Sequence, residues 1–263
     1  MTKTSFRARL AMAVVGGLLF SPLLAPQGGA AQAAEVKVLT SVALTSALDQ
    51  LAPQYERATG NKLTIGYSLI ADIRQRILAG ETADVIILSR PAMDELQKAG
   101  KFAPGPIVNI AGTAVAVAVR AGAPKPDISS VDALRKTLLA AKSVVYADPA
   151  KGGASGVVFA RVIDRLGIAE QLKPKTTLVP GAQSADVVAK GEAEIGVAQT
   201  SEIVPVTGAQ LVGPLPAELG SVTVFSAGIG AGTHAPDAAK SLIQFLTGPV
   251  AAPVFKSQGL EPG

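Results

Sequence analysis

Cysteine is absent from this 263-residue chain, and histidine occurs once, at His234. Without cysteine the chain can form no disulfide, and it has no thiol to carry a lipid anchor. A zinc site of the usual type needs several cysteine or histidine ligands, which a single histidine cannot supply. We therefore predict no metal site, a structural or surface role for His234, and a fold stabilised by burial of apolar side chains.

The first 33 residues have the composition of a secretion signal. Basic residues come first, an apolar run follows over residues 10–24, and the small-residue motif Ala31-Gln32-Ala33 suits a signal peptidase. A membrane-spanning helix is the alternative, but it needs about 20 apolar residues. This run is shorter and is broken by Gly16-Gly17 and Ser21-Pro22. We predict a cleaved signal peptide over residues 1–33 and export to the periplasm.

The net charge of +4 comes largely from that signal. The signal holds three of the 24 lysine and arginine residues and no acidic residue, so the remaining 21 nearly balance the 20 aspartates and glutamates. A balanced charge supplies no basic surface for nucleic acid. We therefore predict no binding to nucleic acid. The later apolar runs have only the length of strands, so we also predict no stable membrane insertion after the signal is cleaved. We expect the protein to be a monomer.

After the signal, short apolar segments alternate with segments of helical periodicity. The first helix holds Leu44, Leu48, Leu51 and Tyr55 on one face and ends at Gly60. Such alternation is typical of βαβ units with mostly parallel sheets, so the predicted fold class is α/β. The predicted strands cover residues 36–40, 63–67, 85–88, 113–119, 144–146, 177–179, 195–199 and 222–229. The other predicted helices cover residues 71–79, 91–99, 131–141, 155–166, 185–190, 236–246 and 250–258.

Two segments rich in glycine and proline, residues 121–127 and 212–217, lie beside the two long apolar strands. We interpret them as the rims of a joint between two lobes. Residues 34–118 then form the first part of lobe one, residues 119–221 form lobe two, and residues 222–263 return to complete lobe one. Ligands of open α/β sheets bind at the carboxyl ends of the strands, so the turns after the strands are the candidate site.

The turn after the first strand is rich in hydroxyl groups. It enters a helix, where free backbone N–H groups and the helix dipole favour an anion. Ser41 is the candidate ligand in this turn, whereas Thr45 or Ser46 suits a helix cap.

A glycine-rich turn over residues 148–156 precedes a later helix. Its glycines let the backbone approach an anion closely, and Lys151, Gly153 and Ser155 are its candidate ligands. The turn lacks the spacing of a nucleotide-binding loop, so we predict no cofactor.

Arg90 follows the third strand, where a guanidinium group can bind a carboxylate through two hydrogen bonds. The alternative is a surface ion pair with Asp94 or Glu95. Of Arg74 and Arg76, on the preceding helix, at most one is expected to face the cleft. No motif of a serine hydrolase occurs, so the sequence does not support that chemistry.

Three segments, Val38–Thr45, Arg76–Val85 and Asp148–Ala150, and the closing residues 246–255 are similar to one known family. They resemble the periplasmic molybdate-binding proteins of ABC importers, and the resemblance covers essentially the whole mature chain. It implies the type II periplasmic binding protein fold, with two lobes joined by two crossing segments. It also implies a small anionic ligand and the membrane component of an importer as a partner.

The ligand-contacting turns depart from that family. The serine of its first turn aligns with Ala43, its second serine-rich turn becomes Ser68-Leu69-Ile70, and a late tyrosine aligns approximately with Gln199. Each hydrogen bond left unmet in a closed cleft costs about 1–3 kcal/mol. Ser68 and Gln199 are candidate ligands, and the ligand is molybdate or, as these turns favour, a polycarboxylate held also by Arg90.

The chain is also similar to the branch of this family that contains periplasmic aconitate isomerases. A binding protein needs only different affinities in its open and closed states, whereas an isomerase needs a base, an acid and cations for three carboxylates. Arg90 and Lys151 can supply the cations, but the sequence does not identify the base, although Asp148 and Glu202 lie near the turns. We predict a solute-binding protein of an ABC importer, with an aconitate isomerase as the alternative.

Overall fold

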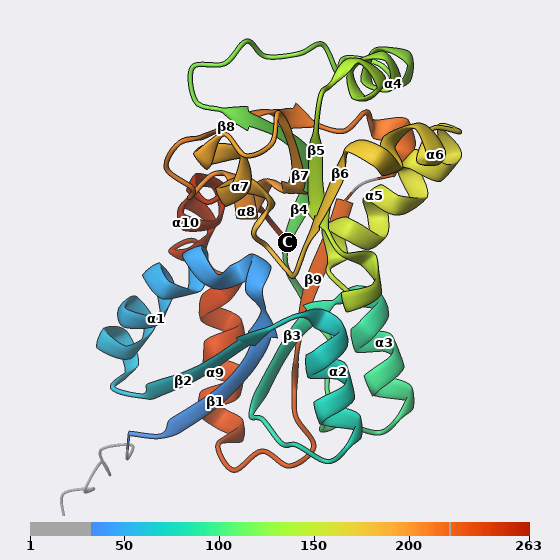
Figure 1. Ribbon diagram of the computed structural model, residues 1–263. Coiled ribbons are helices and arrows are strands. Elements are labelled where there is room, and N and C mark those ends of the chain that lie inside the picture. The colour runs from blue at the N-terminus through green and yellow to red at the C-terminus, as the bar shows by residue number, and fades with distance from the viewer. Residues whose placement is uncertain (1–32, 221) are drawn as a thin grey trace, which may run out of the picture. The chain divides into compact units, whose positions relative to one another are not determined.

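A computed structural model describes residues 33–220 and 222–263, which form one compact unit (Figure 1). The predicted signal peptide lies outside the described residues, apart from its last position. The strands are β1 (Glu35–Ser41), β2 (Lys62–Ser68), β3 (Val85–Ser89), β4 (Val108–Arg120), β5 (Val144–Ala147), β6 (Thr176–Val179), β7 (Ile195–Gln199), β8 (Ala209–Pro214), β9 (Val222–Ile229) and β10 (Glu261–Pro262). The helices are α1 (Thr45–Thr59), α2 (Ile70–Leu78), α3 (Arg90–Lys98), α4 (Val131–Ala140), α5 (Ala154–Arg165), α6 (Ala169–Leu172), α7 (Ser184–Lys190), α8 (Thr200–Ile203), α9 (Pro236–Leu246) and α10 (Ala251–Ser257).

The strands form one mixed sheet in the order β2-β1-β3-β9-β4-β7-β5-β6, with β8 and β10 paired to β4. We call β2-β1-β3-β9 the first half of the sheet and β4-β7-β5-β6 the second half. In each half three strands run parallel, as predicted, whereas β4 and β9 pair antiparallel with their neighbours. Every predicted strand is present.

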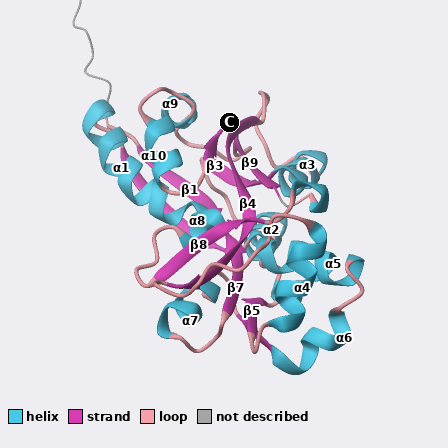
Figure 2. Cartoon of the chain, turned by 90° about the horizontal axis from the view of Figure 1, so that it is seen from above, coloured by secondary structure: helices cyan, strands magenta, loops and turns pink. Residues whose placement is uncertain are grey.

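Apolar side chains alternate along β1 and so reach both faces of the first half. Val36 and Val38 join the core under α1, α9 and α10, whereas Leu39 joins the core under α2 and α3. In the second half α4, α5 and α6 share one core, and α7 and α8 pack on the opposite face. Figure 2 shows the helices gathered on the two sides of the strands. Helices therefore cover both faces of each half, whereas Val222 and Val224 near the start of β9 are exposed.

The long strand β4 belongs to both halves. It pairs with β9 from residue 108 to residue 114 and with β7 from residue 115 to residue 118. The sequence predicted this strand only from residue 113, because the preceding residues lack a continuous apolar run. The lobe boundaries at residues 118 and 221 remain a prediction.

Residues 209–214 form β8, although the sequence predicted a loop rim from residue 212. β8 pairs antiparallel with β4, Arg120 lying opposite Ala209, and so supplies hydrogen-bond partners to the edge of β4. The sequence also did not predict α6, α8 or β10. All are short, and in residues 33–220 and 222–263 no helix is long and apolar enough to cross a membrane.

Candidate functional site

The carboxyl ends of β1, β2 and β3 face those of β5 and β7, and the helices α2, α3, α5 and α8 begin there (Figure 1). The two halves approach each other at two glycines. A Cβ atom placed on Gly152 would lie 2.5 Å from the Cβ atom of Ala71, and one placed on Gly181 would lie 3.5 Å from Leu69. Gly152 has a φ of 76°, so the turn before α5 requires glycine for its backbone as well as for this contact. The start of α2 therefore touches the glycine-rich turn directly.

A cavity of about 610 Å³ opens beside this contact. Its lining includes three arginines, Arg74 on α2, Arg90 at the start of α3 and Arg161 on α5, together with Thr223 of β9. A volume in this range suits a small organic ligand. The cavity therefore combines positive side chains from both halves of the sheet.

Two of these arginines have acidic partners. The Arg74 Nη1 atom lies 2.5 Å from an oxygen of Glu95, and Arg90 Nε lies 2.8 Å from Asp94 Oδ1. The Arg90 and Asp94 side chains are 45% and 44% exposed, and ion pairs at such exposure contribute little to stability. The predicted ion pair with Asp94 is confirmed, and Arg90 also lines the cavity, whereas its binding of a carboxylate ligand stays a prediction.

Arg74 lines the cavity, and its neighbour Arg76 does not. Arg76 instead forms ion pairs with Glu81, where Nε and Oε2 are 2.7 Å apart, and with Asp72. The expectation that at most one of the two faces the cleft is confirmed. Arg161, which sequence reasoning missed, has no hydrogen bond or ion pair among the described residues. Its position inside a helix gave no signal that it would line a cavity.

Ser41 and Ser68 lie side by side, because they are paired in the register of β1 and β2. The buried Ser41 Oγ accepts a hydrogen bond from the N–H of Ala43 at 3.3 Å and so caps the short 3₁₀ helix Val42–Leu44. The expectation that Thr45 or Ser46 caps the first helix is wrong. Thr45 Oγ1 donates instead to the carbonyl of Val42, because the chain enters α1 through this 3₁₀ turn.

The predicted residues of the glycine-rich turn occupy different environments. Lys151 is exposed, Gly153 is buried directly before α5, and Ser155 in the first turn of α5 is buried. A Cβ atom on Gly156 would lie 1.9 Å from the carbonyl oxygen of Ala147, so glycine there lets α5 pack directly on β5. Asp148 Oδ1 accepts a hydrogen bond from the N–H of Ala150 at 2.9 Å, which is the role of a turn residue.

Gln199 and Glu202 form the inner end of this region. The fully buried Gln199 donates from Nε2 to Thr223 Oγ1 at 3.2 Å, and Thr223 lines the cavity. Glu202 Oε2 accepts from the N–H of Gln199 at 3.0 Å and from Ser155 Oγ at 3.4 Å, which links α8 to α5. Burial raises the pKa of the Glu202 carboxyl to about 7, and the two hydrogen bonds only partly oppose this effect.

Several buried polar atoms in this region have no hydrogen-bond partner among residues 33–220 and 222–263. They are Thr40 Oγ1 at the end of β1, Ser184 Oγ at the start of α7, and Gln199 Oε1 and Ser201 Oγ at the end of β7 and in α8. An unpaired buried polar atom costs about 1–3 kcal/mol, so such atoms gather where a ligand or water completes the hydrogen bonding. All four lie at strand ends or at the start of the following helix, which is the edge where α/β sheets bind ligands.

The single histidine lies away from the cavity. His234 is exposed, and its backbone N–H donates to Asp84, in agreement with a structural or surface role. In residues 33–220 and 222–263 no group of three or more metal-ligating side chains occurs.

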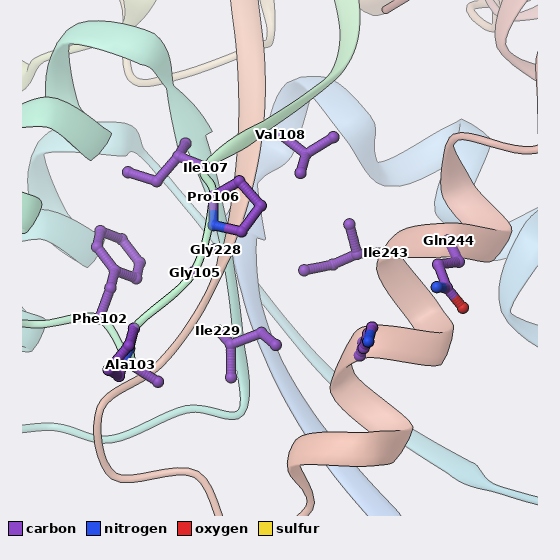
Figure 3. A pocket seen from close by; sticks show the side chains of 12 residues that line it. Phe102, Ala103, Gly105, Pro106, Ile107, Val108, Gly228, Ile229, Ile243 and Gln244 are labelled. Carbon is purple, nitrogen blue, oxygen red and sulfur yellow. The ribbon is translucent and has the colours of Figure 1, made fainter.

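A second cavity, of about 330 Å³, is bounded by strand β9, helix α9 and residues 102–108, which follow α3. Figure 3 shows apolar side chains of Phe102, Ile107, Ile229 and Ile243 around it. Lys240 is its single charged lining residue, and none of the predicted site residues reaches it. It therefore contributes nothing to the anion site.

Comparison with known proteins identifies the family of this chain. A family profile for bacterial extracellular solute-binding proteins matches residues 36–261. The chain is 36% identical to the aconitate isomerase of Pseudomonas sp over 97% of each chain, and 29% identical to the molybdate-binding protein ModA of Azotobacter vinelandii over 96% of each chain. The solved periplasmic molybdate-binding protein of Azotobacter vinelandii superposes with a TM-score of 0.73 at 21% identity, covering 87% of this chain and 99% of that one.

Proposed function

Because this chain belongs to the bacterial extracellular solute-binding protein family, with the fold of type II periplasmic binding proteins, we propose that it is exported to the periplasm and closes around a small polycarboxylate. The observation that carries this proposal is the cavity of about 610 Å³ with arginines from both halves of the sheet. Guanidinium groups match carboxylates in charge and in bidentate geometry. The closed protein would deliver this anion to the membrane component of an ABC importer.

The first turn argues against a metal oxyanion as the ligand. Ala43 has no hydroxyl group where the molybdate-binding family is expected to have serine, so the turn offers one hydroxyl donor fewer to an oxyanion. A tetrahedral oxyanion held by neutral donors would lose hydrogen bonds there, whereas a larger carboxylate can reach Arg74, Arg90 and Arg161. The site thus favours several carboxylates spaced along one small molecule.

A second candidate function is isomerisation of the bound anion. The 36% identity with an aconitate isomerase, extending over almost the full length of both proteins, favours it specifically. Aconitate carries three carboxylates, and the cavity has three arginines. The same pocket could thus hold the anion for delivery or for chemistry.

We expect the melting temperature of the exported protein, purified from the periplasm of an expression host, to rise with cis-aconitate, trans-aconitate or citrate and to change little with molybdate or sulfate. A ligand that binds only the folded state stabilises it by about 2.7 kcal/mol at a concentration of 100 Kd. A thermal-shift titration measures this effect. Stabilisation by molybdate alone would contradict the polycarboxylate proposal.

Turnover separates the two candidate roles. The protein is incubated with trans-aconitate, and formation of cis-aconitate is followed by proton NMR. Sustained turnover would establish the isomerase, whereas binding without turnover would leave delivery to an importer as the function.

We expect Arg90→Ala to weaken carboxylate binding by more than tenfold, because a charge-assisted hydrogen bond is about twice as strong as a neutral one. Isothermal titration with the stabilising anion measures the Kd. Lys98→Ala is the matched control, since this exposed cation lies at the far end of the same helix. Equal affinity of the Arg90 variant and the control would place Arg90 outside the binding site.

A further inference from the structure

Glu202 is held by one oxygen and free at the other. Its Oε2 atom accepts the hydrogen bonds from Gln199 and Ser155, as described above. In the part of the chain that the structure describes, Oε1 accepts no hydrogen bond. It is also not one of the buried polar atoms without a partner, so it remains accessible. A carboxylate with one anchored and one accessible oxygen has a fixed direction toward a ligand, which general-base catalysis requires.

The other carboxylates near the cavity already have an ion-pair or hydrogen-bond partner. Asp94 and Glu95 pair with Arg90 and Arg74, and Asp148 closes its own turn. Glu202 has no cationic partner among the described residues. It is thus the carboxylate at these strand ends that remains available to accept a proton.

Glu202 also stands between the two halves. The short helix α8 that carries it follows β7 in the second half and packs against the Val42–Leu44 turn of the first half. Its neighbour Gln199 reaches Thr223 on the wall of the cavity. Glu202 does not itself line this cavity, but the hydrogen bond from Gln199 to Thr223 connects its helix to the cavity wall, at the inner end of the region between the halves.

We propose that Glu202 is the general base that moves an allylic proton in a bound aconitate. This assignment rests on the isomerase candidate described above. Glu202 Oε1 takes one proton from the methylene carbon, and the electron pair of that C–H bond shifts into the adjacent C=C unit, giving a delocalised carbanion. The same proton, or one from water, is then added to the former vinylic carbon, and Glu202 returns to its ionised form. The double bond has moved by one position, and nothing is oxidised or reduced.

In this step Glu202 moves the proton, and the arginines stabilise negative charge. Arg74, Arg90 and Arg161 offset the negative charge of the three carboxylates, which would otherwise oppose formation of a carbanion. Gln199 Oε1 and Ser201 Oγ, which have no hydrogen-bond partner in the described part of the chain, lie close in sequence to Glu202 and can contact the ligand or a bound water.

The protonation state of Glu202 suits this role. With a pKa raised to about 7 by burial, a substantial fraction of the carboxyl is ionised at neutral pH, and the base is strong enough to accept a proton. The neighbouring elements carry few charges. The Val42–Leu44 turn, β7 and β8 contain no titratable residue, β4 contains Arg120 at its far end, Asp148 and Lys151 precede α5, and α5 carries Arg161, Asp164 and Arg165.

Glu202→Gln tests the assignment, because glutamine retains the hydrogen bond to the N–H of Gln199 and the capping role but cannot take the proton. We expect kcat for aconitate isomerisation to fall by about 10²–10⁴-fold, the usual range for loss of general-base catalysis, with Kd changed by less than about threefold. We also expect deuterium exchange of the methylene protons in D₂O to be lost. In the unmodified protein, kcat should rise with pH with a midpoint near 7. Glu192→Gln, an exposed residue outside the site, is the matched control and should keep full activity.

The outcomes separate this inference from the proposed function. If the unmodified protein neither isomerises aconitate nor exchanges its methylene protons, the isomerase candidate fails, and the base assignment fails with it. If the unmodified protein turns over and Glu202→Gln retains more than a fifth of its kcat, the isomerase stands and Glu202 is not the base. Should the glutamine variant fold poorly, Glu202→Asp replaces it, and an unchanged kcat and pH midpoint in that variant would overturn the assignment.

Discussion

Replacement of Ala71 by leucine is expected to weaken anion binding by ten- to a hundredfold and to leave the free energy of unfolding nearly unchanged, because the unliganded protein can open its two halves and so relieve the contact. Ala71 lies in the first turn of α2, and a Cβ atom on Gly152 would already be 2.5 Å from its side chain. A larger side chain at position 71 therefore prevents this approach of the two halves. Overpacking of a close contact costs about 1–3 kcal/mol, and every 1.4 kcal/mol is a factor of ten in affinity.

The measurement is isothermal titration with the stabilising anion, paired with urea unfolding of the free protein. Leucine is a good helix former, so α2 itself should be preserved. Gln75→Leu is the matched control, because this exposed residue lies on the same helix and does not line the cavity. Undiminished affinity in Ala71→Leu would show that the contact between Ala71 and Gly152 is not needed for binding.

Replacement of Asp84 by alanine is expected to lower the free energy of unfolding by about 3–4 kcal/mol, because three donors would lose their acceptor in a buried place. Asp84 is 8% exposed. Its Oδ2 accepts from the N–H of Lys37 at 2.8 Å, and its Oδ1 accepts from Thr233 Oγ1 at 2.7 Å and from the N–H of His234 at 3.0 Å. This carboxylate joins β1 to the turn between β9 and α9.

The effect of Asp84 should depend on pH. Burial by itself would raise the pKa of Asp84, but the hydrogen bonds from Lys37, Thr233 and His234 outweigh burial and lower it. The carboxylate therefore stabilises the fold fully above the ordinary aspartate pKa of about 3.9, and this contribution is lost as the pH falls through the lowered value.

Urea unfolding at neutral pH and in acid measures the difference between the unmodified protein and Asp84→Ala. We expect the difference to shrink in acid. Asp186→Ala is the matched control, because Asp186 is exposed and its side chain has no hydrogen bond among the described residues. It should change the free energy of unfolding by about 0.5 kcal/mol at most. A loss below about 1 kcal/mol for Asp84→Ala would mean that its hydrogen bonds are replaced by water.

The sequence alone determined the longer helices, the predicted strands and the edge of the sheet at which we place the ligand site. The apolar periodicity of α1 and the alternation along β1 depend only on residues close together in the chain. The sequence alone therefore predicts both elements. For the same reason the turns that hold Ser41 and Ser155 could be selected before the structure was known. The signal peptide and the domain limits are likewise sequence predictions, and they stay predictions.

Only the tertiary structure decided which of the candidate side chains meet. Ser155 and Glu202 are 47 residues apart in the sequence, and Asp84 and His234 are 150 apart, yet each pair is hydrogen-bonded. Arg161 drew no attention in the sequence, and the sequence did not identify a base, although Asp148 and Glu202 both lie near the turns. Their distinct roles depend on burial and on partners brought close by the pairing of distant strands, and a local pattern of residues contains no information on either.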